Sequence, residues 1–170
     1  MRPTRFQQFT IDLITKAAHP AVKGAQTFGD AGFTDAPDFS GEVIQFASGA
    51  TAYLHHPVTA PVGENYDQAE APVEGEEAIE PVAFPDGFGQ GGKIKVQDLE
   101  AWLLALYASS GSREIKSLNA WSQRDGGTPE HAGVTVTFHS EGIMHVAVAH
   151  LLRPGQSTDQ QKWYGPSLEV

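Results

Sequence analysis

Histidines on a predicted pair of strands are the residues of this chain best suited to chemistry. His139 and His145 fall on the polar face of a predicted hairpin, 133–152, as diagonal neighbours within reach of one metal ion. His55 joins them if a second predicted hairpin, 42–56, pairs edge to edge with the first. Imidazole is a common metal ligand at neutral pH, so a three-histidine site is chemically reasonable. No HExxH or similar pattern accompanies these histidines, and we predict no metal and no cofactor.

Two other catalytic groupings can be drawn from the sequence, and neither has supporting spacing. Ser140, His139 and Asp125 supply the residue types of a hydrolase triad, but the Gly-x-Ser-x-Gly motif is absent. Glu76 and Glu77 are paired carboxylates in a segment without a secondary-structure period, where catalytic geometry is not held rigid. We therefore predict no catalytic residue and favour a protein that is not an enzyme.

The histidines depend on the hairpin at 133–152, the longest alternating segment of the chain. A three-residue loop, Ser140–Gly142, with Gly142 in the left-handed conformation, closes the turn and sets Phe138 opposite Met144. This register gathers on one face Val134, Val136, Phe138, Met144, Val146 and Val148. Because a slip of one residue exchanges the two faces, burial should select this pairing.

The segment 42–56 predicts a second hairpin, with Gly49 in the place of Gly142. Its apolar face holds Ile44, Phe46, Ala50, Ala52 and Leu54. The two hairpins align as Ile-Gln-Phe-Ala-Ser-Gly and Val-Thr-Phe-His-Ser-Glu-Gly, which indicates an internal duplication or one turn chemistry used twice. Six residues do not establish a repeat, so we favour the second explanation.

Three segments have the period of amphipathic helices: 4–18, 96–110 and 112–123. A capping box of Thr4 and Gln7 begins the first, which ends before Pro20. The other two resemble a helix-turn-helix in outline. In an acidic chain, we expect them to be core helices instead.

Together these elements predict an α+β fold in one domain, 1–170. Two antiparallel hairpins form a four-stranded sheet, with about three helices packed on one face. The segment 21–40 predicts an irregular loop with room for one short strand. Phe28, Phe33 and Phe39 attach this loop to the core.

Charge is concentrated in a Pro- and Gly-rich segment, residues 57–92, which we call the arm. The arm holds eight acidic residues and no Lys or Arg, whereas the other 134 residues carry a net charge of only −2. A long irregular segment of this kind is a functional arm or a disordered linker. It can meet a basic partner or mimic DNA.

The C-terminal tail, 154–170, is polar except for three large apolar side chains, Trp163, Tyr164 and Leu168. We expect it to dock on this subunit or on a neighbour. The predicted partner-binding residues lie in the arm and the tail: Glu74, Glu76, Glu77, Glu80, Phe84, Phe88, Trp163 and Tyr164.

Composition excludes several classes of function. The chain has no cysteine, which excludes disulfides, thiolate zinc sites and cysteine nucleophiles. The net charge of −10, with no basic face in the sequence, argues against direct nucleic-acid binding. We also predict no signal peptide, no transmembrane segment and no membrane partner, and a location in the cytoplasm or in a virion.

In topology alone, a leading helix followed by hairpins and packed helices is loosely similar to small tail-terminator and head–tail connector proteins of tailed phages. The resemblance implies a structural subunit of a larger assembly, as a homo-oligomer or with other protein subunits. Two alternatives stay open. One is a small metal-binding or hydrolytic domain that uses the hairpin histidines, and the other is an acidic inhibitor that mimics DNA.

Overall fold

Two helices and an antiparallel sheet make up the α+β fold that the sequence predicts. The computed structural model describes residues 1–33, 39–126, 131–160 and 163–170. The helices are α1, Pro3–Ala17, and α2, Val96–Ala108. The strands are β1 Val22–Thr27, β2 Gly41–Phe46, β3 Thr51–His55, β4 Val58–Thr59, β5 Ile115–Ala120, β6 Gly133–Phe138 and β7 Ile143–Leu152. Three short 3₁₀ turns complete the list: η1 Gln90–Gly92, η2 Trp121–Gln123 and η3 Thr158–Gln160.

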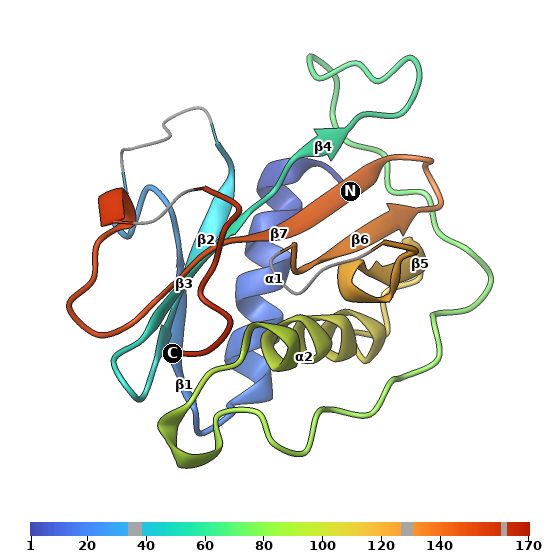
Figure 1. Cartoon of the computed structure of the whole chain (residues 1–170). Helices are drawn as coiled ribbons and strands as arrows, with labels where there is room; N and C mark the ends of the chain where they lie inside the picture. Colours follow the sequence, from blue (N-terminus) through green and yellow to red (C-terminus); the bar gives the residue numbers. More distant parts are fainter. Residues whose placement is uncertain (34–38, 127–130, 161–162) are drawn as a thin grey trace.

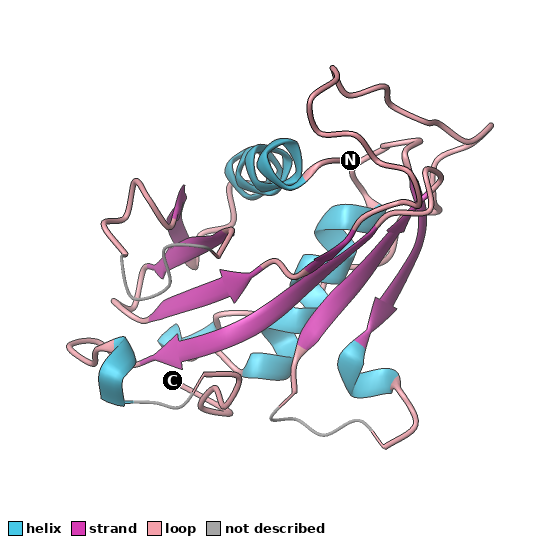
Figure 2. Ribbon diagram, turned by 90° about the horizontal axis from the view of Figure 1, so that it is seen from above, coloured by secondary structure: helices cyan, strands magenta, loops and turns pink. Residues whose placement is uncertain are grey.

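The sheet is larger than the four strands predicted. Its order is β1-β2-β3-β7-β6-β5, every pair is antiparallel, and β4 adds to β7 (Figure 1). Both helices pack on one face, with α1 over β1 and β2 and α2 over β5, β6 and β7 (Figure 2). The core lies between this face and the helices, and the opposite face of the sheet is called the outer face below.

The predicted helix at 112–123 is wrong, because this segment forms strand β5 and the turn η2. Its apolar residues Ile115 and Leu118 are three positions apart, which suits a helix. A β-bulge after Ile115 produces the same spacing in a strand, since the extra residue puts Ile115 opposite Phe138 and Leu118 opposite Val136, both on the core face. The helix-turn-helix outline disappears with this correction.

The other two helices form where the sequence predicts them, with a different start for α1. Pro3 occupies its first turn and Arg2 is its N-cap without a side-chain hydrogen bond, so the predicted capping box does not form. Gln7 instead donates its side-chain amide to the carbonyl of Gly41. Ala18, in the left-handed conformation, ends α1.

The chain contains the same structural unit twice. The first repeat, residues 3–55, is α1-β1-β2-β3, and the second repeat, residues 96–152, is α2-β5-β6-β7. Their strand registers correspond: Val22–Phe46 matches Ile115–Phe138, and Thr27–Glu42 matches Ala120–Val134. Because β3 pairs with β7, the two repeats join into one sheet. The likeness of the two hairpins therefore extends over whole units.

The hairpins confirm the predicted faces and correct one register. In the second hairpin Val136 is opposite Met144, two residues away from the predicted pairing, so the same side chains stay on the core face. Glu141, with φ of 67°, takes the left-handed position that we assigned to Gly142. Glu141 thus corresponds to Gly49, whose φ is 87°.

The predicted irregular loop at 21–40 contributes β1 at the sheet edge. Phe28 is buried and Phe33 contacts it edge to face, with 4.9 Å between ring centroids. Phe39 is stacked on His55 at 4.1 Å. Residues 34–38 lie outside the described part of the chain.

Candidate functional site

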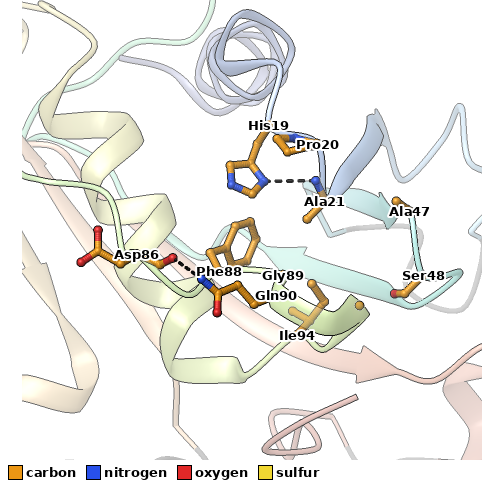
Figure 3. Close-up of a pocket in the computed structure, with 11 residues that line it drawn as sticks. His19, Pro20, Ala21, Ala47, Ser48, Asp86, Phe88, Gly89, Gln90 and Ile94 are labelled. Atoms are coloured by element: carbon orange, nitrogen blue, oxygen red, sulfur yellow. Dashed lines mark hydrogen bonds between the residues drawn. The ribbon is translucent and has the colours of Figure 1, made fainter.

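One cavity of the first repeat is lined by a histidine but by no converging catalytic groups (Figure 3). It has a volume of about 560 Å³ and lies between the end of α1, the β2–β3 turn and the end of the arm. His19 accepts the amide hydrogen of Ala21 through Nδ1 at 3.2 Å. Ser48 is on the other side of the cavity, and Asp86 uses its backbone carbonyl to hold Gln90. The side chains of His19, Ser48 and Asp86 therefore do not form a catalytic arrangement.

The beginning of the arm is held against its own chain by two arginines, Arg2 and Arg5. Strand β4 pairs with β7, and the arm then runs along the outside of the molecule to α2 (Figure 1). Arg2 binds Glu64 at 2.7 Å, and Arg5 binds Glu70 at 2.7 Å. The Arg5 hydrogen bonds lower the pKa of the Glu70 carboxyl from 4.5 to about 2. Arg5 also pairs with Glu114 at 2.6 Å, so it joins α1, the arm and the second repeat.

The second half of the arm has further attachments. Gly75 donates its N–H to the carbonyl of Arg113 at 2.8 Å, and Glu74 pairs with the Arg113 guanidinium. The ring of His139 packs so close to Gly75 that a Cβ there would be only 2.3 Å from Nε2. Phe88, which is buried, stacks on Trp102 with 4.8 Å between centroids. The arm is therefore a covering of its own domain, attached at intervals.

Between these attachments the arm presents an exposed segment, residues 76–84, which we call the acidic strip. Ile79 packs on the core, whereas Glu76, Glu77 and Glu80 are exposed. Within the described residues, these three carboxylates make no hydrogen bond or ion pair. Val82 and Phe84 follow them, and 44% and 45% of their respective surfaces are exposed. The strip combines unpaired negative charge with apolar surface.

The C-terminal tail docks on its own chain. Ile94 and Val170 exchange backbone hydrogen bonds of 2.7 and 2.9 Å, and Lys93 pairs with Glu169 at 2.9 Å. Trp163 packs on the outer face, 4.5 Å from the ring of His150. Of the predicted partner-binding residues, Phe88 and Trp163 thus pack within this chain and Glu74 is paired. Glu76, Glu77, Glu80, Phe84 and Tyr164 are exposed, and so is the paired Glu74.

The three histidines that the sequence suggests as metal ligands lie in three different environments. His139 packs against the arm. His145 contacts Thr135 Oγ1 through Nδ1 at 3.2 Å, and His55 bonds the Tyr164 hydroxyl. Burial, with a smaller effect of His56, lowers the pKa of His55 to about 4. In the described part of the chain, no three His, Asp or Glu side chains are close enough to hold a metal ion.

The serine–histidine–aspartate combination is also separated. His139 donates its backbone N–H to Glu114, beside the start of β5. Asp125 follows the end of β5, at the opposite end of the same strand pair. Ser140 Oγ is buried and has no hydrogen-bond partner among the described residues. The sheet direction therefore keeps Asp125 a strand length away from Ser140.

Sequence reasoning missed a buried ion pair on the core face. His56 Nε2 lies 2.8 Å from Glu42 Oε2, and both side chains are fully buried. Burial raises the pKa of the Glu42 carboxyl, and the neighbouring His56 opposes this shift. The alternation that puts Ile44 and Leu54 in the core also puts Glu42 there, and this pattern is the signal that could have revealed the pair.

Comparison with known proteins adds no assignment: no family model, no curated protein and no solved structure matches this chain. Among the described residues, neither helix has the length and apolar character needed to cross a bilayer.

Proposed function

We propose that this chain is a non-enzymatic assembly subunit that contacts partner proteins through the acidic strip. The observation that carries the proposal is the distribution of exposed apolar side chains. Among the described residues, nine large hydrophobic side chains are exposed, and six of them belong to the arm. Exposed apolar groups concentrated on one segment are typical of a protein-binding surface.

The attachments of the arm support this role because they present the strip in a defined conformation. Gly75 is tied to Arg113 before the strip, and Phe88 is buried after it. A segment that is already ordered loses less conformational entropy on binding, so more of its contact energy becomes affinity. Val82 and Phe84 can then act as apolar anchors.

The charge of the strip indicates the chemistry of the partner. Glu76, Glu77 and Glu80 lie within five consecutive residues of a chain with a net charge of −10. Such a surface attracts a basic partner and repels an acidic one, and its association slows as salt rises. The acidic inhibitor considered above uses the same surface and differs only in what the basic partner does.

The test uses point substitutions, because deletion of the arm would also remove β4 and the buried Phe88. One variant changes Val82 and Phe84 to Ser, and a second changes Glu76, Glu77 and Glu80 to Gln. The control for the first variant is Val62→Ser, at a fully exposed arm residue outside the strip. The control for the second variant changes three exposed aspartates outside the strip, Asp12, Asp67 and Asp86, to Asn.

Assembly of the wild type, the two strip variants and the two controls is measured by light scattering on the purified chain and by co-purification from its native host. We expect the strip variants to lose self-association or the co-purifying partner and the controls to keep it. Retention of the same mass and the same partners by the strip variants would contradict the proposal.

The particular assembly that we propose is a virion, with this chain as a tail-terminator or head–tail connector type of subunit. What supports this narrower proposal is the order of elements, a leading helix followed by hairpins and a packed helix. Electron microscopy of the purified chain checks it: rings of one diameter are expected. Particles of undefined shape would contradict the virion proposal, whereas the broader assembly proposal would stand.

A further inference from the structure

The outer face of the second repeat contains a cavity of about 440 Å³ that the proposed function does not use. Its lining includes three buried residues, Ala132, Ala147 and Val148. Six further residues complete its lining: Pro57, Trp121, Arg124, His131, His145 and Tyr164. We call it the Arg124 pocket. Its size is in the range of sites for small organic molecules.

In the first repeat, a side chain fills the position that is equivalent to the Arg124 pocket. Phe28 and Tyr53 of the first repeat correspond to Trp121 and His145 of the second. Phe33 lies against both, at 4.9 Å from Phe28 and 5.0 Å from Tyr53. An aromatic ring of the chain thus packs at this position in the first repeat, whereas the second repeat has the Arg124 pocket. The apolar part of a fitting ligand therefore has the size of a ring.

The polar side of the Arg124 pocket is cationic. The Arg124 guanidinium lies 5.0 Å above the ring of Trp121 and bonds Thr135 Oγ1, but it makes no ion pair with any described carboxylate. Among the described residues, no acidic side chain lines the pocket. Arginine in this setting suits the planar, two-oxygen geometry of a carboxylate.

A strained residue forms one wall. Tyr164 has φ of 59°, which is unusual for a residue other than glycine. Its N–H donates to Ala149 at 3.1 Å and its hydroxyl bonds His55, and these contacts hold it at the edge of the pocket. Backbone strain of this kind is found at ligand-binding positions.

We propose that the Arg124 pocket binds a small organic carboxylate whose apolar body is the size of one ring. The carboxylate pairs with Arg124, with His145 beside it, and the ring rests on Trp121 and Ala147. This site is independent of the acidic strip, since none of its lining residues belongs to residues 76–84.

Three probe molecules of related shape separate the two contacts in the proposal, the charge contact with Arg124 and the apolar contact with the ring. Phenylacetate carries the ring and the charge, phenylacetamide keeps the ring without the charge, and acetate keeps the charge without the ring. Titration of the isotope-labelled full chain by NMR should show phenylacetate binding with a Kd of about 1 mM or tighter. The amide and acetate should each bind about tenfold more weakly, because each lacks one of the two contacts.

A single substitution assigns the binding to this pocket. Arg124→Gln should weaken phenylacetate about tenfold and leave phenylacetamide unchanged, while Arg153→Gln, at another exposed arginine, should change neither. The backbone spectrum of each variant verifies that it is folded. Shifted resonances should cluster on Trp121, His145 and Tyr164.

His145 gives an independent readout. It faces Arg124 and Trp121 on one side, Thr135 of β6 on another, and shares the pocket with His131 and Tyr164. Burial, with Arg124 second, lowers the pKa of His145 in the free protein, and a bound carboxylate should raise it. Equal binding of all three probes, shifts elsewhere on the molecule, or no binding of phenylacetate would overturn the proposal.

Discussion

The two repeats share an architecture and differ in what fills equivalent positions. Glu42 of the first repeat and His56, which directly follows this repeat, correspond to Val134 and Val148 of the second, so a buried ion pair and two valines occupy matching places. On the outer face, one repeat has a packed Phe33 where the other has the Arg124 pocket. The strand register therefore does not depend on these side chains, which leaves them available for other roles.

The largest expected effect comes from breaking the buried ion pair. His56→Val alone leaves the Glu42 carboxyl buried without a partner, and we expect a loss of about 3–5 kcal/mol in the free energy of unfolding. Changing both residues to Val copies the second repeat and should restore stability to about the wild-type value or above it. Urea unfolding of the wild type, both single variants and the double variant measures the coupling.

The reciprocal experiment sharpens this comparison. Val134→Glu together with Val148→His installs the pair in the second repeat, where packing has no provision for it, and should destabilise the protein. If the double valine variant of the first repeat is as unstable as the sum of its single changes, the two positions are not equivalent in the way that the register indicates.

A smaller effect concerns the joint between the repeats, where Arg5 binds both Glu70 of the arm and Glu114 of the second repeat. The pKa of Glu70 is lowered from 4.5 to about 2 in the folded protein. Its ion pair therefore stabilises the fold fully above pH 4.5, and this contribution disappears as pH falls toward 2. Because the pair is partly exposed, we expect about 0.5–1 kcal/mol.

Comparison of Glu70→Gln with the wild type in urea unfolding across this pH range measures that contribution. The variant should lose less stability than the wild type between pH 4.5 and 2. Glu80→Gln, at a carboxylate without a partner among the described residues, is the control and should follow the wild type. An identical pH dependence for Glu70→Gln and the wild type would mean that the Arg5–Glu70 ion pair adds nothing to the free energy of unfolding.

The two turns allow a further comparison, with effects of similar size. Gly49 and Glu141 have the same left-handed conformation, which glycine adopts freely and glutamate does not. Glu141→Gly should therefore raise the free energy of unfolding by about 1 kcal/mol, and Gly49→Ala should lower it by about 1–2 kcal/mol. Thermal melting detects both changes. A neutral Glu141→Gly would show that local contacts of the glutamate offset the backbone strain.

The comparison of the repeats also explains which predictions from sequence succeeded. Alternation placed Ile44, Phe46, Val134 and Val136 on the core face, and helical spacing located α1 and α2 within two residues. These are local patterns, and local patterns persist in the fold. The bulge in β5 defeated the same reasoning, because one extra residue converts the period of a strand into a spacing typical of a helix.

The candidate sites were less accessible from sequence. The arm was recognised as acidic and irregular, but its attachment through Arg2, Arg5 and Arg113 was not predicted. Nor was the Arg124 pocket, since Trp121 and Arg124 were assigned to a helix and its end. The pattern of one segment contains no information about which distant residues it meets.

By itself, the sequence determined the α+β class, the apolar faces of both hairpins and the concentration of charge in the arm, because each follows from neighbouring residues and their period. Only the tertiary structure decided that the arm covers its own domain, that Glu42 meets His56 in the core, and that one repeat keeps a cavity that the other fills. These outcomes depend on contacts between residues far apart in the chain, whose energies are settled by packing and burial after the strands have paired.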